Sequence, residues 1–378
     1  MWVNAQHLMH RLAPFNRVLY VNNLGLRPPG RSRGDWSKVR KRVGEWFSGA
    51  VEVEKNLWVV SPVSIPLHHW FSVQKLNQAA LTHALVSHLH RLNFHNPILW
   101  SFLPLGSSLC GRLGESLVIY HCVDDYAANP GVAANELRAM EQRLLSAADL
   151  VLTTNPVLYQ ERKTQTRYAV YLGNVAQTSH FEPDPARSIP AEMEQVPRPI
   201  LGYQGNISGY KTDLPLLIAL AKAMPQAGIV LVGPVGWGDP GTDISALKSL
   251  PNVHFIGRVA FSDLPAYVSA FDVGLLPLRD NESTRRSFPM KFYEYMAAGK
   301  PIVATDLPAF APYRERTHLC RLADNHPAFI KAVQDALADS DLHLSERIAE
   351  ARANSWDVRV EQISRLVAEA LALKEGPR

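Results

Sequence analysis

The sequence lacks the features that define several large classes of protein. Its 378 residues contain no run of about 20 apolar residues that could cross a bilayer. The N-terminus has no apolar core followed by a small-residue cleavage site, so no secretory signal is predicted. The three cysteines, Cys110, Cys122 and Cys320, are too few and too far apart for a disulfide framework or a metal pair. We therefore expect cysteines that act as small buried hydrophobes in a cytoplasmic protein.

The net charge is also small, but it is distributed unevenly along the chain. The net charge is only +4, yet residues 27–50 hold seven Lys or Arg against two acids, with Trp36, Trp46 and Phe47 between them. Such a segment could lie on an anionic membrane surface or a lipid-linked acceptor, which would put the protein at the inner face of the membrane. It could equally be a solvated loop between two strands. Because no binding motif accompanies the charge, no nucleic-acid partner is expected.

Composition and periodicity predict an α/β protein with two domains. Hydrophobic residues make up 47% and charged residues 20%, which is typical of globular proteins, and the length exceeds one ordinary core. Short apolar strands alternate with amphipathic helices, as in parallel α/β layers. The strands expected in the first half are 17–23, 57–63, 97–103, 117–122, 149–154 and 169–173, and its helices are 72–92, 135–148 and 156–165.

A proline-rich linker at residues 182–199 precedes a second series of strands and helices. The predicted domains are therefore residues 1–181 and 200–354, with a C-terminal segment at 355–378. Two doubly wound halves would place ligands at the carboxyl ends of their strands. The first clear strand starts only at Arg17, after a helix-like segment, so the first domain either lacks its leading strand or is abbreviated at one edge. The strands expected in the second half are 200–203, 228–232, 253–257, 272–278 and 302–305, and its helices are 214–224, 263–270, 289–298 and 327–337.

The segment Ser287–Pro301 (SFPMKFYEYMAAGKP) carries the strongest chemical signal. It predicts a helix with Pro289 in the first turn and Gly299 at the end. Lys291 in that first turn opposes the helix dipole unless an anion binds there, and free backbone N–H groups with a lysine suit a phosphate. Glu294, one turn later, could accept two hydrogen bonds from a ribose diol. An ordinary surface pair of lysine and glutamate is the alternative.

Three stretches resemble a known family. P-x-K-x-x-E-Y-x-A-x-G-K-P-I-V-A-T, from Pro289, closely resembles the donor-binding segment of glycosyltransferase family 4 and its GT-B relatives. ILGYQGNISGYKTDLPLLIALA is similar to the family's first strand, phosphate loop and helix, and SWDVRVEQI is similar to its last helix, which crosses back to the first domain. The resemblance implies the GT-B fold, in which two Rossmann-like doubly wound parallel-sheet domains face a cleft.

The resemblance also implies roles for single residues. Glu294 would bind ribose or sugar hydroxyls, and Lys211 and Lys291 would neutralise the diphosphate that leaves. The family's first acidic position is Arg286 here, and its loop arginine is Asn206, so contacts to the sugar ring and one phosphate contact depart from the pattern. The full set of donor-binding candidates is Gly205, Asn206, Lys211, Arg258, Arg286, Ser287, Pro289, Met290, Lys291 and Glu294.

The first half offers candidates on the acceptor side. LVIYHCVDDYAANPG resembles a strand-end segment in one branch of the family, so His121, Asp124 and Asp125 could orient the acceptor hydroxyl or the sugar, with Asp124 added to the catalytic candidates. An aspartate pair after a strand also often caps the next helix. Thr154 and Asn155 could likewise cap a helix or contact a substrate.

The predicted reaction is transfer of a hexose-type unit from a UDP- or GDP-sugar to a polysaccharide or lipid-linked acceptor. By resemblance the anomeric configuration is retained, and no cofactor or metal is expected, because the sequence Asp280-Asn281-Glu282 is interpreted as ordinary loop polarity. A non-catalytic GT-B module that binds a nucleotide-sugar, or a nucleotide-sugar epimerase, are the alternatives. An NAD enzyme is disfavoured because no convincing G-x-G-x-x-G is present.

Overall fold

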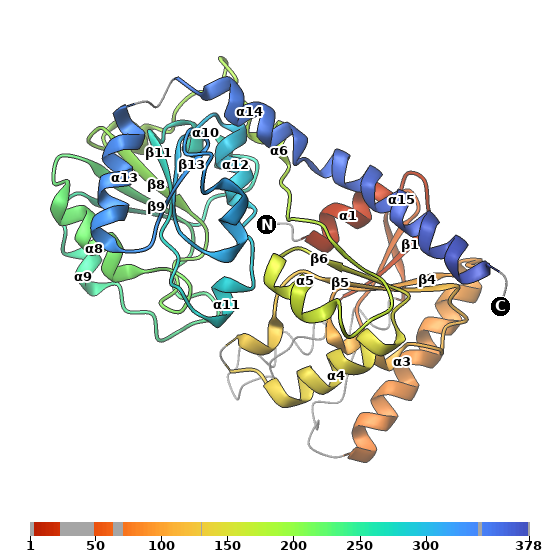
Figure 1. Ribbon diagram of the computed structural model, residues 1–378. Helices are drawn as coiled ribbons and strands as arrows, with labels where there is room; N and C mark the ends of the chain where they lie inside the picture. The colour runs from red at the N-terminus through yellow and green to blue at the C-terminus, as the bar shows by residue number, and fades with distance from the viewer. Residues whose placement is uncertain (1–3, 23–48, 63–70, 130, 339–341, 377–378) are drawn as a thin grey trace. The chain divides into compact units, whose positions relative to one another are not determined.

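The computed structural model describes residues 4–22, 49–62, 71–129, 131–338 and 342–376 (Figure 1). The chain divides into two compact units. The N-terminal unit contains Trp2–Thr153, Leu158–Tyr171 and Val360–Arg378, and the C-terminal unit contains Thr154–Val157 and Leu172–Arg359. Most of the basic segment, residues 27–48, lies outside the described residues, so its contact with a membrane stays a prediction.

The C-terminal unit is built on a six-stranded sheet in which every pairing is parallel. The strand order is β10-β9-β8-β11-β12-β13, which in chain order is 3-2-1-4-5-6, the doubly wound arrangement. The order reverses between β8 and β11, and ligands of such sheets bind outside the carboxyl ends of the strands at that point. The strands are β8 (Ile200–Gln204), β9 (Gly228–Val232), β10 (Val253–Gly257), β11 (Val273–Leu276), β12 (Ile302–Thr305) and β13 (Cys320–Ala323).

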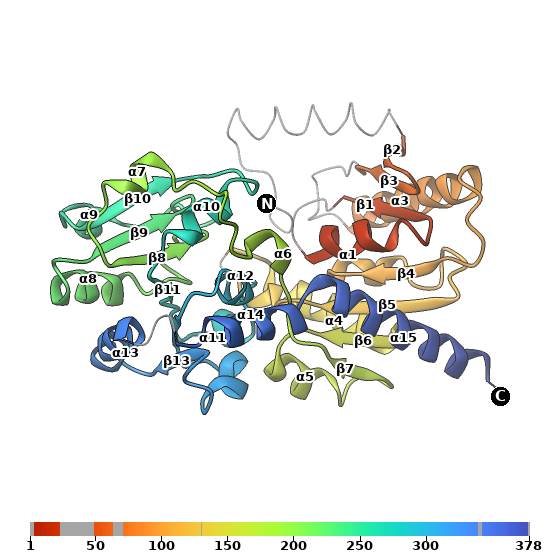
Figure 2. The ribbon, with the colours of Figure 1, turned by 90° about the horizontal axis from the view of Figure 1, so that it is seen from above.

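Helices cover both faces of this sheet, as Figure 2 shows. On one face, apolar side chains of α8 and α13 form a core with Leu201, Ile229 and Leu275 of the strands. On the other face, side chains of α10 and α12 form a second core with Val230 and Leu276. The helices of the unit are α6 (Thr178–Phe181), α7 (Ala191–Glu194), α8 (Leu214–Ala223), α9 (Ser245–Lys248), α10 (Leu264–Ser269), α11 (Glu282–Arg285), α12 (Lys291–Ala297), η3 (Pro308–Tyr313), α13 (His326–Ala338) and α14 (Leu344–Ala353).

The N-terminal unit contains two separate sheets. A parallel sheet has the order β4-β5-β6-β7, and α4 and α5 pack on the face that holds Tyr120 and Val151. A smaller sheet has the order β1-β3-β2, with β1 parallel and β2 antiparallel to β3. The strands are β1 (Val18–Val21), β2 (Val51–Glu54), β3 (Leu57–Val60), β4 (Ile98–Ser101), β5 (Leu117–Cys122), β6 (Leu150–Thr153) and β7 (Ala169–Tyr171). The helices are α1 (Asn4–Leu12), α3 (Phe71–Arg91), η1 (Pro104–Ser108), η2 (Tyr126–Ala128), α4 (Ala134–Ala147) and α5 (Pro156–Arg162), while α15 (Trp356–Glu375) has residues in both units.

The fold class predicted from the sequence is confirmed, and most predicted elements are present within a few residues of their expected ends. Two strands were not expected: β2, whose side chains are all exposed, and β13, which follows a long irregular stretch. The predicted linker, residues 182–199, lies within the C-terminal unit and includes α7. All three cysteines are free, and two of them, Cys122 and Cys320, are buried. Among the described residues, no helix is long and apolar enough to span a membrane.

Candidate functional site

Two glycines shape the carboxyl end of the C-terminal sheet. Gly205 follows β8 directly and Gly233 follows β9, with φ angles of +131° and +141°, a region that side chains disfavour. A Cβ at Gly233 would lie 2.0 Å from the Gly205 carbonyl oxygen, so the two loops approach as closely as backbone allows. These glycines stand beside the point where the order of strands reverses, which is where ligands of doubly wound sheets bind.

The loops that follow β8 and β11 are joined by backbone and side-chain hydrogen bonds. The Asp213 N–H donates to the Pro277 carbonyl at 2.8 Å, and the Arg279 N–H donates to the Lys211 carbonyl at 2.9 Å. The Asn281 amide adds a bond to the Tyr210 carbonyl at 2.6 Å. These bonds fix Lys211 in the loop after β8, one of the two lysines expected to face a diphosphate.

Lys291, the other lysine, begins α12 and reaches back to the end of β8. Its Nζ lies 4.0 Å from the centroid of the Tyr203 ring, which is a short cation–π contact. A Cβ at Gly205 would lie 2.3 Å from the same Nζ, so a glycine is required for the ammonium to occupy this position. The N–H groups of Phe292 and Glu294 donate to the carbonyls of Pro289 and Met290. These two backbone N–H groups are thus already paired within the helix. The Lys291 ammonium is the group of this turn that could bind an anion.

Tyr203 reports the positive potential at this point. Its side chain is 2% exposed, and burial by itself raises the pKa of a phenol. The pKa of Tyr203 is nevertheless lowered, because Lys291, a hydrogen bond with Thr212 and the charge of Lys211 together outweigh burial. Both lysines therefore act on one buried hydroxyl, and their charges add where the β8 strand ends.

Glu294 is buried beside this cation. Burial raises its pKa to about 7, although Lys291 and a hydrogen bond from Gln204 partly oppose that shift. The Gln204 side-chain amide donates to the Glu294 carboxylate, and the Gln204 backbone N–H donates to the Tyr295 hydroxyl at 2.8 Å. The carboxylate is thus held on the last residue of β8, within one turn of the lysine at the start of α12.

The charged residues before α12 are paired with one another. Arg285 pairs with Asp280, and Arg286 pairs with Glu282 at 2.9 Å. Asn281 caps α11 in a reciprocal arrangement with Thr284. The segment Asp280-Asn281-Glu282 therefore has partners for each of its side chains, and among the described residues no group of three His, Cys, Asp or Glu could hold a metal ion.

Two buried asparagines hold the loop that leads into α12. The Asn155 amide donates to the carbonyls of Arg285 and Ser287, each at 3.1 Å, and the Asn174 amide donates to the Phe288 carbonyl at 2.8 Å. The Asn155 oxygen also accepts the Val157 N–H at the start of α5. Asn155 is thus both a helix cap and a support for the loop with Ser287, Pro289 and Met290.

Asn206 and Arg258 both contact Trp237. The Asn206 side chain exchanges two hydrogen bonds with the Trp237 backbone, at 2.8 and 3.1 Å. The Arg258 guanidinium carbon lies 5.7 Å from the centroid of the Trp237 ring. Asn206 stands at the position of the family's loop arginine. Its side-chain amide joins the loop after β8 to the loop after β9.

The acceptor-side candidates lie at the end of β5 in the N-terminal unit. His121 is buried, and its ring stacks on Phe102 with centroids 5.1 Å apart. Asp125 is the N-cap of η2, where its carboxylate accepts the Ala127 N–H at 3.1 Å. Asp124 is partly exposed. The capping interpretation therefore holds for Asp125, while a role for His121 and Asp124 toward a substrate stays a prediction.

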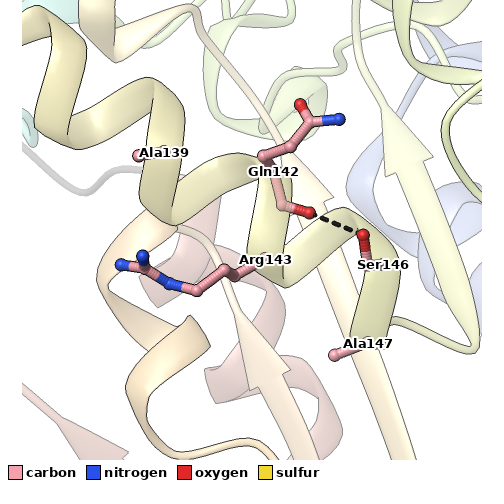
Figure 3. Close-up of a pocket in the computed structure, with 5 residues that line it drawn as sticks. All are labelled: Ala139, Gln142, Arg143, Ser146 and Ala147. Carbon is pink, nitrogen blue, oxygen red and sulfur yellow. Dashed lines mark hydrogen bonds between the residues drawn. The ribbon is translucent and has the colours of Figure 1, made fainter.

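A surface hollow lies away from these strand ends, on the outer face of α4 (Figure 3). Five exposed residues of this one helix line it, and Gln142 and Ser146 are joined by a hydrogen bond from the Ser146 hydroxyl to the Gln142 carbonyl. A hollow formed by a single helix face offers no converging polar groups and is not part of the candidate site. The residues that line it are Ala139, Gln142, Arg143, Ser146 and Ala147.

Comparison with known proteins agrees with this geometry. Residues 198–339 match the protein family described as Glycosyl transferases group 1. The chain has the GT-B fold, and residues 198–339 are similar to a glycosyltransferase domain. The TuaH protein of Bacillus subtilis (strain 168), named as a teichuronic acid biosynthesis glycosyltransferase, is 28% identical over 284 residues, which is 70% of each chain.

GT-B proteins of known structure are similar over nearly the whole chain. HepE of Anabaena, solved in complex with UDP, has a TM-score of 0.69 with 16% identity over 96% of this chain and 95% of that one. Sucrose-phosphate synthase of Thermosynechococcus elongatus has a TM-score of 0.69 with 17% identity over 95% of this chain and 100% of that one. The predicted GT-B fold is thereby confirmed, and the similarity to glycosyltransferases lies in residues 198–339, whereas membership of family 4 in particular stays a prediction.

The structure adds residues to the candidate site that the sequence did not indicate. Tyr203 ended the predicted strand 200–203 and Gln204 followed it without an assigned role, yet their side chains meet Lys291 and Glu294. The usable signal was their place at the carboxyl end of the first strand of a doubly wound unit. Asn174 gave no local signal, because its partner is 114 residues away in the sequence.

Proposed function

We propose that this glycosyltransferase transfers a hexose-type sugar from a nucleotide-diphosphate sugar to a polysaccharide or lipid-linked acceptor. The observation that carries the proposal is the Lys291 ammonium, held against Tyr203 and Gly205 beside the buried Glu294. A cation and a carboxylate in this order suit a diphosphate joined to a ribose diol. Their place at the reversal of strand order in the C-terminal sheet supports the same ligand.

The chemistry assigned to these residues follows from charge. The bond between the sugar C1 and a diphosphate oxygen breaks, a bond from C1 to an acceptor oxygen forms, and the proton of the acceptor hydroxyl passes to an oxygen of the departing diphosphate. Negative charge that develops on the departing diphosphate is neutralised by Lys211 and Lys291, so the step as proposed needs no metal. Retention of anomeric configuration is part of the proposal, and Asp124 is its acceptor-side residue.

The choice of donor and acceptor draws on similar proteins. HepE is seen with UDP and with UDP-glucose, which favours a UDP-sugar over a GDP-sugar for this chain. TuaH is named for teichuronic acid biosynthesis, which favours a polymeric or lipid-linked acceptor. An action at the inner face of the membrane, through residues 27–50, is proposed on their charge alone.

A donor screen tests the proposed function. The purified chain is incubated with single UDP- and GDP-sugars and a lipid extract, and the release of UDP or GDP is measured. We expect release from at least one UDP-sugar that rises several-fold when acceptor is added. Release that is independent of acceptor would indicate hydrolysis only, and no release from any donor would contradict the proposed transfer.

A non-catalytic module that binds a nucleotide-sugar is the second candidate, and one observation favours it. Arg286 replaces the acidic residue that the family uses toward the sugar ring, and it pairs with Glu282 instead. Calorimetric binding of UDP or GDP, combined with no transfer in the donor screen, would support this alternative.

A further inference from the structure

Trp237 is the most exposed tryptophan in the described part of the chain, with 69% of its surface accessible. Trp58 and Trp356, by comparison, are 9% and 2% exposed. A single exposed apolar side chain is ordinary on a protein surface. What sets Trp237 apart is its place, because it follows β9 at the carboxyl edge of the C-terminal sheet, beside the loop that holds Lys211.

The backbone under Trp237 is fixed. Its N–H and carbonyl both bond to the Asn206 side chain, and the flanking Gly236 and Gly238 have φ angles of +63° and +76°. The Gly236 N–H also donates to the Ile207 carbonyl at 2.8 Å. These bonds hold the backbone that carries the exposed indole, so less conformational freedom is lost when a ligand binds there.

A cation stands beside this ring. Arg258 follows β10, is exposed, and places its guanidinium carbon 5.7 Å from the centre of the Trp237 ring. An indole face stacks on flat rings of any base, and a guanidinium offers N–H donors to carbonyl and ring-nitrogen acceptors. The pair therefore combines a flat apolar ring with N–H donors beside it, the two properties that a nucleobase matches.

The order of the strands places Trp237 and Arg258 within the length of a nucleoside diphosphate from the lysines proposed to bind phosphate. The loops that hold Lys211, Trp237 and Arg258 follow β8, β9 and β10, which are adjacent in the sheet. Neighbouring strands are about 4.8 Å apart, so these loops span about 10 Å. A nucleoside diphosphate whose phosphates lie at the end of β8 can reach the neighbouring loops with its base.

We propose that the Trp237 indole stacks on the nucleobase of the donor, with the Arg258 guanidinium at the polar edge of that base. This inference rests on the proposed function and names the residue that receives the base. A pyranose ring could also pack on an indole. In that case Trp237 would contact the sugar of the donor and not its base. The two occupants predict different effects on UDP and on UDP-glucose.

Calorimetric titrations with UDP, UDP-glucose and inorganic pyrophosphate test the inference on the full chain. We expect Trp237→Ala to weaken the binding of UDP and of UDP-glucose by about 10-fold and to leave the binding of pyrophosphate unchanged. Trp237→Phe keeps an aromatic face and should stay within about 3-fold of the wild type. Phe15→Ala, which removes an aromatic ring that is 85% exposed in the N-terminal unit, is the matched control and should change nothing.

The other outcomes separate this inference from the proposed function. Unchanged UDP affinity in Trp237→Ala would overturn the stacking role and leave a nucleotide-sugar site intact. A loss for UDP-glucose without a loss for UDP would show that the ring faces the sugar, and an equal loss for pyrophosphate would show a distorted loop; each overturns the inference. A wild-type chain that binds neither UDP nor GDP would instead contradict the proposed function itself.

Discussion

In the C-terminal unit the side chains at the strand ends hold a cation and a carboxylate side by side, whereas in the N-terminal unit they mostly complete local structure. Lys291 and Glu294 are kept close by Tyr203 and Gln204. Asp125, in contrast, caps a short helix. The comparison teaches that the residues of the proposed donor site belong to one unit, so donor binding should be measurable without an acceptor.

The largest expected effect comes from removing either charged group of the donor site. Lys291→Ala and Glu294→Ala should each lower transfer by about 100-fold or more, because stabilisation of the leaving diphosphate or the ribose is lost. Rates of nucleotide release with the best donor check this. Lys222→Ala removes an exposed lysine on α8 of the same unit and should keep wild-type activity. Wild-type rates in both site variants would refute the assignment.

The pH dependence of stability sharpens the description of Glu294. Its folded-state pKa of about 7 lies above the ordinary 4.5, so its contribution to stability is complete below pH 4.5 and is lost as the pH rises through 7. Glu294→Gln does not titrate. The free energy of unfolding of the wild type relative to this variant should therefore fall by about 3 kcal/mol between pH 5 and pH 8.

Denaturant titrations of both proteins at the two pH values measure this difference. If the stability of wild type and Glu294→Gln changed with pH in the same way, burial would not raise the pKa of the Glu294 carboxyl group. That result would contradict the burial of this carboxylate as described.

Asn155 tests how the loop before α12 is supported. Asn155→Asp keeps the oxygen that accepts the Val157 N–H but removes the donor to the Arg285 and Ser287 carbonyls. We expect a loss of about 1–3 kcal/mol in the free energy of unfolding, because two buried carbonyls lose their partner. UDP affinity should fall with it. A variant as stable as the wild type would show that the loop is held by other contacts.

The smallest effects are expected in the N-terminal unit. Asp125→Ala removes a helix cap and should cost about 1 kcal/mol of stability without changing UDP affinity.

Asp124→Asn should lower transfer about 10-fold while UDP affinity stays the same, since its proposed role concerns the acceptor. Thermal melts, calorimetry and nucleotide release separate the two variants. A reduced UDP affinity in either would break the division of roles between the units.

Much of the fold was predictable because buried strands and helices leave recognisable patterns of apolar residues in the sequence. Apolar runs such as Gly228–Val232, which is buried throughout, and Ile302–Thr305, which is buried except for its last residue, were predicted with their observed bounds. β2 (VEVE) and β13 (CRLA) were not predicted, since the first is exposed throughout and the second mixes an arginine into four residues. Their pairing depends on neighbouring strands rather than on their own composition.

The candidate site was predictable to a smaller extent. The spacing of Lys291 and Glu294 allowed either a donor site or an ordinary surface pair, and the family resemblance favoured the donor site. The structure places Lys291 at Gly205 and Glu294 at Gln204. The hydrogen bonds between Asn206 and Trp237 and the ion pair between Arg286 and Glu282 depend on how the loops fold. Such pairings join side chains to partners that only the folded chain selects, so spacing alone cannot indicate them.

The most direct test of the central claim is a crystal structure of the chain with UDP bound. The account predicts the diphosphate between the side chains of Lys211 and Lys291 and the ribose hydroxyls within hydrogen-bond distance of the Glu294 carboxylate. UDP bound elsewhere, or with its ribose turned away from Glu294, would contradict the assignment of the donor site.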